Sequence, residues 1–263
     1  MWEQGDGAAA GPPALKGTHV AAAAWRAMRA RPRPLVAIGV VYAAFAVASQ
    51  WSARALAVTE GLPAVTPKFV AYSIVGGVLG ALFAALTLRT LLQPGRSAWR
   101  PDAGLFAYVV LLTVAGVGLN LLVLGYGNPP PADAADPQAA MAFLGRAVVV
   151  MGIYVVAAWA CLRLMLWPIS LLLGEGTVPP SRSFGLMRRA VWPFVFAAAI
   201  LGIGPVIVWG VVASQYTTEG GEWRLVIGAP FLVFFAMACA AVGAEVYRRR
   251  VATAPGGVAD TFD

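Results

Sequence analysis

The side chains that could carry acid–base, nucleophilic or metal chemistry are few in this 263-residue chain and lie far apart in it. His19 is the single histidine, and the two cysteines, Cys161 and Cys239, fall inside long apolar stretches. One imidazole without neighbouring thiolates or carboxylates cannot form a zinc or iron site, and a serine nucleophile would have only His19 as its base. We therefore predict no catalytic residue, no metal and no cofactor. We expect both cysteines to be free thiols that fill apolar space.

Five other polar residues lie within or near the ends of apolar stretches. Arg163 and Glu245 could pair with each other or, as we expect, extend toward lipid headgroups. Asn120 could contribute to a polar site, but a hydrogen bond to a neighbouring helix is the expected state. Asp102 and Glu175 form the only carboxylate pair that a lipid-modifying enzyme could use at one face of a membrane.

Six long apolar stretches separate these residues and account for most of the chain. Hydrophobic residues make up 60% of the sequence and charged residues 12%, with a mean hydropathy of +0.75, which is more apolar than a soluble fold can bury. About 20 helical residues cross the ~30 Å hydrocarbon core of a bilayer. The predicted fold class is all-α, a polytopic integral membrane bundle with six transmembrane helices: Leu35 to Gln50, Phe69 to Leu92, Gly104 to Leu124, Ala147 to Leu173, Ala190 to Ala213 and Leu225 to Val246.

The basic residues alternate between the two sides of the predicted membrane domain. Fifteen of the 19 Lys and Arg residues fall in the N-terminal segment, near the second and fourth connections, and in the C-terminal segment. By the positive-inside rule these segments are cytoplasmic, which predicts a multi-pass protein of the bacterial inner membrane with both termini in the cytoplasm. Apolar helices separate these arginines, so we expect no nucleic-acid partner. The expected partners are membrane lipids, with a second copy of the chain or other membrane proteins as further candidates.

Two short basic stretches, Thr18–Ala30 and Ser181–Pro193, precede the first and fifth apolar runs. Each predicts a short amphipathic helix at the membrane interface. The two stretches align at an offset of 159 residues, which matches Met28 with Met187 and indicates either a duplicated hairpin or chance.

The predicted domain organisation is a disordered leader (residues 1–17), a transmembrane domain (18–251) and a disordered tail (252–263). Pro168 and Pro205 fall within the fourth and fifth runs, where proline should bend or loosen a helix. Small residues at four-residue spacing in the second run, among them Gly77, Ala81 and Ala85, predict close packing between helices.

The region between the fourth and fifth runs carries a longer pattern. Arg163 ends a span, Pro168 follows, then Glu175-Gly176, and then the stretch from Ser183 to Arg189, Ser-Phe-Gly-Leu-Met-Arg-Arg. This pattern is similar to that of the membrane domain fused to some bacterial glycerophosphodiester phosphodiesterases, which also occurs alone. The resemblance covers about residues 18–250 and implies six helices and an envelope- or lipid-related role. The hydrolase half has no counterpart here, so phosphodiesterase activity is not implied.

This region has specific expected geometry. We expect Ile169 to Leu173 to stay at the interface and Glu175-Gly176 to form a turn, with glycine supplying the backbone conformation. Pro179 and Pro180 can open the next helix, where a missing N–H costs nothing. We expect Glu175 to pair with Arg163 or Arg188 and so to fix this cytoplasmic corner.

These features favour a non-enzymatic integral membrane protein with a scaffolding, regulatory or lipid- and envelope-related role. A small-molecule or lipid transporter is the alternative, indicated by Pro205, Asn120 and the repeat. An integral-membrane lipid enzyme is a third hypothesis, which depends on Asp102 and Glu175.

Overall fold

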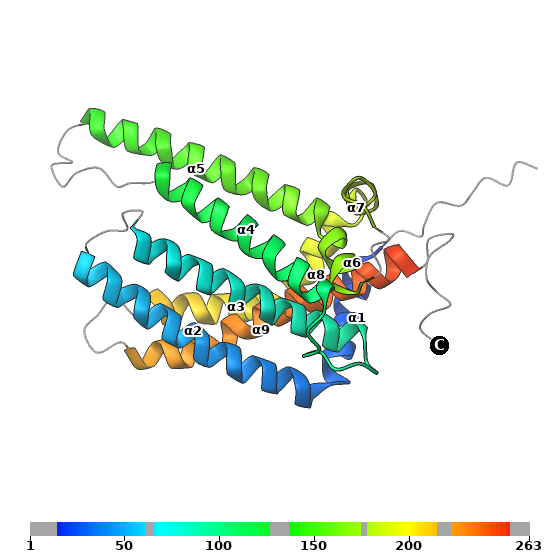
Figure 1. Cartoon of the computed structure of the whole chain (residues 1–263). Coiled ribbons are helices and arrows are strands. Elements are labelled where there is room, and N and C mark those ends of the chain that lie inside the picture. Colours follow the sequence, from blue (N-terminus) through cyan, green and yellow to red (C-terminus); the bar gives the residue numbers. More distant parts are fainter. Residues whose placement is uncertain (1–14, 61–65, 127–136, 175–177, 215–221, 253–263) are drawn as a thin grey trace, which may run out of the picture.

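A computed structural model describes residues 15–60, 66–126, 137–174, 178–214 and 222–252 of the chain (Figure 1). Within these residues the chain forms nine α-helices and one π-helical turn, and it contains no strand, which confirms the predicted all-α bundle. The elements are α1 (Gly17–Arg29), α2 (Pro32–Glu60), α3 (Pro67–Leu92), α4 (Ala103–Tyr126), α5 (Pro137–Leu164), α6 (Leu166–Leu172), α7 (Pro180–Met187), α8 (Val191–Ser214), α9 (Glu222–Tyr247) and η1 (Arg248–Ala252).

Six of these helices are long and apolar enough to cross a membrane, so the chain is a multi-pass membrane protein by the length and composition of its helices. The candidate spans are Pro32–Ser49, Pro67–Leu92, Ala103–Leu122, Leu144–Leu164, Val191–Val212 and Val226–Val251. The segments predicted as leader and tail lie almost wholly outside the described residues.

The short elements gather at one end of the long helices. Figure 1 shows α1, α6, α7 and η1 at this end, beside the end of α3 and the start of α4. We call it the arginine-rich end, because the following residues belong to it: Lys16, Arg26, Arg29, Arg31, Arg33, Arg89, Arg96, Arg100, Arg163, Arg182, Arg188, Arg189 and Arg248 to Arg250.

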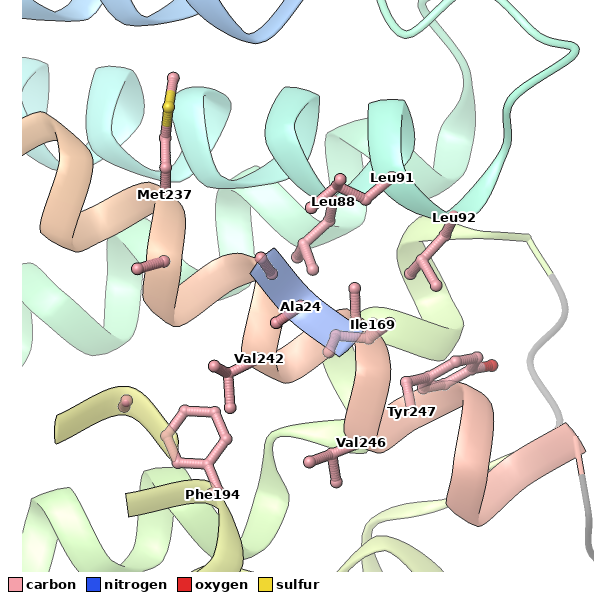
Figure 2. Packing of buried hydrophobic residues seen from close by; sticks show 14 of the residues in the cluster. Ala24, Leu88, Leu91, Leu92, Ile169, Phe194, Met237, Val242, Val246 and Tyr247 are labelled. Atoms are coloured by element: carbon pink, nitrogen blue, oxygen red, sulfur yellow. The ribbon is translucent and has the colours of Figure 1, made fainter. Parts of the chain in front are cut away.

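Helix α9 lies at the centre of the bundle, in contact with α1, α2, α3, α6 and α8. Of its candidate span 44% is buried inside the protein, whereas none of the span of α5 is. The last turns of α9 are buried all round, so this helix forms the core of the bundle. Figure 2 shows side chains of α9 packed against residues of α1, α3, α6 and α8: Met237, Val242, Val246 and Tyr247 against Ala24, Leu88, Leu91, Ile169 and Phe194.

Helix α1 is amphipathic, as its sequence predicts. Val20, Ala24 and Met28 are buried on one face, and this face packs against α8 and α9. Arg26 and Arg29 lie exposed on the other face. The apolar side of α1 is thus covered by protein, and the helix crosses the bundle at the arginine-rich end.

The fourth apolar run is not one span, which corrects the prediction of a single helix from Ala147 to Leu173. Helix α5 ends at Leu164, and the separate helix α6 begins at Leu166. Pro168 lacks an N–H and its ring excludes the carbonyl of residue 164, so the break falls one turn before it. Ile169 and Leu172 of α6 are buried among α3, α4 and α9 at the arginine-rich end, and the expectation that residues 169–173 lie at the membrane interface stays a prediction.

Small residues set the closest helix contacts. A Cβ added at Gly77 of α3 would lie 3.2 Å from the Thr113 side chain of α4, and Ala81 and Ala85 are buried on the same face. A Cβ added at Gly202 of α8 would overlap the Phe235 ring of α9. Small residues therefore allow close contact between α3 and α4, in agreement with the packing predicted for the second run, and also between α8 and α9.

Candidate functional site: an apolar membrane cavity beside an arginine corner

A buried arginine joins three elements at the arginine-rich end. Arg89 is 3% exposed and lies in the last turn of α3. Its Nη1 donates to the carbonyl oxygen of Arg100 at 2.7 Å, and its Nη2 donates to the Asp102 carboxylate and, at 3.2 Å, to the carbonyl oxygen of Leu172. A guanidinium out of water is stable only when it is paired and hydrogen-bonded. These contacts therefore hold the end of α3, the start of α4 and the end of α6 together, and we call this group the arginine corner.

Asp102 serves the corner as a helix cap and a counter-ion. Its Oδ1 accepts a hydrogen bond from the backbone N–H of Leu105 at 2.8 Å, in the first turn of α4. Burial alone would raise the pKa of this carboxyl, but the hydrogen bonds from Leu105 and Arg89 outweigh burial and hold the pKa below its ordinary value of 3.8. Glu175, the other carboxylate of the enzyme hypothesis, lies outside the described residues.

Two further arginines bind the last carbonyls of α3. Arg31 donates to the carbonyl oxygen of Thr90, and Arg248 donates to that of Leu91. The final carbonyls of a helix lack intrahelical partners and carry the negative end of the helix dipole, so cations suit this position. Partial burial, and next the neighbouring charge of Arg248, lower the pKa of Arg31.

Glu245 pairs within its own segment, and not with Arg163. Its Oε1 lies 2.6 Å from Nε of Arg249, and its Oε2 lies 3.5 Å from Nη1 of Arg248. These partners follow Glu245 by three and four residues, so the same helical face brings them together. The pairs that Glu245 forms are thus with Arg248 and Arg249 of its own segment, and its expected extension toward headgroups stays a prediction.

Arg163 packs between two aromatic rings. Its Cζ lies 5.0 Å from the ring centroid of Trp159 and 4.9 Å from that of Phe184, and its Nη1 donates to the Phe184 carbonyl at 3.3 Å. The Ser183 hydroxyl donates to the carbonyl oxygen of Arg163 at 3.1 Å. Contacts to rings and backbone therefore join the end of α5 to α7.

The structure describes only part of the cytoplasmic corner that was predicted between the fourth and fifth apolar runs. Pro168 is buried in α6, and Arg188 is exposed just after α7. Glu175 and Gly176 lie outside the described residues, so the Glu175 ion pair and the turn at Gly176 stay predictions. In the described part of this connection the positive φ, 75°, belongs to Gly174.

The two intramembrane candidates do not meet in a site. Asn120 is exposed near the far end of α4, where α3 and α4 diverge (Figure 1). Pro205 is half-buried, and α8 continues through it without interruption.

An apolar cavity of about 500 Å³ lies within the bundle beside the arginine corner. Helices α3, α4, α5, α6 and α9 line it, and we call it the membrane cavity. Its size falls within the roughly 300–1,000 Å³ typical of ligand pockets. Ala115 of α4 and Cys161 of α5 are both lining residues and both exposed, so the cavity reaches the surface of the bundle between these helices.

The lining of the membrane cavity suits hydrocarbon. Cys161 and Cys239 both face it, and both are free, as predicted. Ala236, Ala240 and Gly243 of α9 also line it, at a spacing that follows one helical face. These small residues opposite the break at Pro168 are the one signal in the sequence that could have indicated the cavity.

Within the described residues, no group of three or more His, Cys, Asp or Glu side chains is placed to hold a metal ion. Comparison of the chain with protein-family models, with curated proteins and with solved structures found no match. The relation to the membrane domain of glycerophosphodiester phosphodiesterases therefore stays a prediction.

Proposed function

We propose that this chain is a non-enzymatic membrane protein that binds a hydrocarbon chain of a membrane lipid in its membrane cavity, and that it scaffolds or regulates a lipid- or envelope-related process of the bacterial inner membrane. The observation that carries this proposal is the cavity itself, which is lined by apolar side chains and open between α4 and α5.

Physical chemistry limits how such a site can work. The bilayer is as apolar as the cavity, so leaving it gives a lipid chain no hydrophobic gain. Binding must come from packing against the cavity wall, which favours chains of matching shape. This selectivity suits a protein that holds or senses a particular lipid, and it agrees with the lipid-related role that the resemblance implies.

Two observations support a non-enzymatic role. The Asp102 carboxylate, half of the pair on which the enzyme hypothesis depends, is engaged by Arg89 and by the N–H of Leu105. None of the described residues that line the cavity is a carboxylate or an imidazole that could act on a bound lipid.

A photoreactive phospholipid with a diazirine in its acyl chain tests the proposal. Ala115→Trp places a large ring at the mouth of the cavity, and Val114→Trp places the same ring on a neighbouring exposed residue that does not line it. With protein in phospholipid vesicles, peptide mass spectrometry should find crosslinks at Cys161 and Cys239 in the native chain. These crosslinks should fall several-fold in Ala115→Trp and persist in Val114→Trp. Equal crosslinking in both variants would contradict the proposal.

Lipid transport is the second candidate function. It is favoured by the lateral opening of the cavity and by the position of α5, whose span has no buried residue. Vesicles that contain the protein and a fluorescent phospholipid distinguish the two roles, because a transporter speeds the exchange of label between leaflets. Exchange at the rate of protein-free vesicles favours static binding.

A further inference from the structure

A second apolar hollow runs along the outside of the bundle, between α1, α2 and α9. Its volume is about 450 Å³, and it shares no lining residue with the membrane cavity. We call it the α1–α2 groove. Leu35, Gly39 and Val40 of α2 face Val233 and Met237 of α9 across it. A Cβ added at Gly39 would lie 2.9 Å from the end of Met237, so the missing side chain lets Met237 of α9 approach α2 closely at the floor of the groove.

One end of the groove carries a positive charge. Arg29 and Trp25 line it there, and Cζ of Arg29 lies 5.2 Å from the centroid of the Trp25 ring. Trp25 in turn packs edge-on against Phe234 of α9, with ring centroids 6.2 Å apart. Among the described residues that line the groove none is acidic, so no carboxylate of this lining neutralises the charge of Arg29. Tryptophan and arginine together are typical of the headgroup level of a membrane.

The length of the groove matches one leaflet. On α2 its lining extends from Pro32 to Ala43. At about 1.5 Å per residue this is roughly 16 Å, about half of the ~30 Å hydrocarbon core. Val36 and Val40 are exposed along the way, so the groove is open to the bilayer throughout.

We propose that the α1–α2 groove binds a phospholipid with an anionic headgroup from the leaflet at the arginine-rich end. One acyl chain lies between α2 and α9, and the phosphate accepts hydrogen bonds from Arg29. A guanidinium donates two parallel hydrogen bonds to phosphate oxygens, and the net negative charge of the headgroup matches the uncompensated cation. This site is independent of the membrane cavity and of the function proposed for it.

Two arginines on one helix provide a matched test of the charge. Arg29 lines the groove, whereas Arg26 is exposed on α1, donates to its own helix at the Ala22 carbonyl and does not line the groove. Native mass spectrometry in detergent should count bound phosphatidylglycerol and phosphatidylcholine on each variant. Arg29→Gln should bind phosphatidylglycerol roughly five- to tenfold more weakly, and Arg26→Gln should bind it like the native chain. If both variants lose phosphatidylglycerol binding equally, the lipid is attracted by the overall surface charge and not by Arg29, which would overturn the proposal.

Two valines test the acyl-chain half in the same way. Val40 is 64% exposed and lines the groove, and its neighbour Val41 is 62% exposed and does not. Val40→Trp should release the bound phospholipid, and Val41→Trp should retain it. If both variants retain the phospholipid, its acyl chain does not lie between α2 and α9, and this part of the proposal is wrong.

Two further measurements distinguish a phospholipid in the groove from a free anion and from a lipid in the membrane cavity. Inorganic phosphate at millimolar concentration should not displace phosphatidylglycerol; displacement would identify a free anion as the occupant and overturn the lipid assignment. Ala115→Trp places a large ring at the mouth of the membrane cavity and should leave phosphatidylglycerol bound in the α1–α2 groove. Loss of that lipid in Ala115→Trp would place it in the cavity and contradict the groove.

Discussion

The buried Arg89 guanidinium donates hydrogen bonds to oxygen atoms of Arg100, Asp102 and Leu172 in place of water. Arg89→Met would keep the length of the side chain but leave these oxygens without their donor. Removing one partner of a fully buried ion pair costs roughly 3–5 kcal/mol. Because the Asp102 side chain is 44% exposed, we expect about 2 kcal/mol here. Thermal unfolding in detergent should show a midpoint roughly 4–8 °C lower.

Arg96→Met is the matched control for this prediction, because Arg96 is exposed in the same connection between α3 and α4. Its stability should stay within about 0.5 kcal/mol of that of the native chain. If Arg96→Met and Arg89→Met lower the midpoint equally, net charge and not the arginine corner stabilises this end.

The Asp102 carboxyl predicts a dependence of stability on pH. Its pKa is lower in the folded chain than the ordinary value of 3.8, so the folded state favours the ionised form. The resulting stabilisation is complete above the unfolded-state pKa and is lost as pH falls through the folded-state pKa. Asp102→Asn should therefore unfold below the native midpoint at pH 6, and the two midpoints should converge once the pH falls below the folded-state pKa of Asp102. A difference that is the same at both pH values would show that ionisation of Asp102 does not stabilise the fold.

Residue-scale chemistry could be predicted from the sequence only in part. We expected Glu245 to pair with Arg163 or to extend toward headgroups, although its spacing from Arg248 and Arg249 on one helix could have indicated the pairs that form. The role of Arg89 could not be predicted, because two of its acceptors are backbone carbonyls positioned by the fold. Arg163 likewise sits between rings of α5 and α7 that come together only after α6 turns the chain.

Among the elements, the contact between the start of α4 and the end of α6 is the tightest contact with backbone atoms that a glycine substitution can test. A Cβ added at Gly104 would lie 2.5 Å from the carbonyl oxygen of Leu171 and 3.0 Å from that of Leu172. Backbone atoms cannot rotate away, so Gly104→Ala must separate α4 from α6 and weaken the arginine corner. We expect a loss of about 1–3 kcal/mol, measured as a lower unfolding midpoint in detergent.

Gly118→Ala lies on the same helix and provides the control. A Cβ at Gly118 meets nothing within 4 Å, and alanine is the better helix former. Its midpoint should equal or exceed that of the native chain. A stable Gly104→Ala protein would show that α4 and α6 are not held in the close contact described.

Elements were more predictable than single residues, with one informative exception. Apolar length placed all six spans, since a run of about 20 apolar residues has few alternatives to a transmembrane helix. Pro168 correctly indicated a disruption of the fourth run. The burial of α6 was missed because seven apolar residues after a proline look the same in sequence whether lipid or protein surrounds them. The membrane cavity was missed because it results from the separation of α4 and α5 from α9.

The whole molecule is asymmetric, with α9 in the core and α5 at the edge. One structural observation supports the internal repeat. The offset of 159 residues aligns Met28 with Met187. The same offset aligns Pro32 with Val191, which are the first residues of α2 and α8. Both methionines are buried, each on a short helix that precedes a span. The two short helices have different neighbours, however: α1 packs on α8 and α9, and α7 packs on α5.

The orientation of the bundle is the last prediction, and it belongs to the molecule as a whole. Helices α1, α6 and α7, the turn η1 and the α3–α4 connection lie at one end of the spans (Figure 1), and most of the basic residues of the sequence belong to this arginine-rich end. The positive-inside rule assigns that side to the cytoplasm. Alkaline phosphatase fused after Pro131 or Gly221 should be active in the periplasm, and a fusion after Val251 should be inactive. Green fluorescent protein at the same three positions should report the opposite pattern. Reversed activities would place the arginine-rich end outside the cell, and with it the leaflet from which the α1–α2 groove takes its lipid.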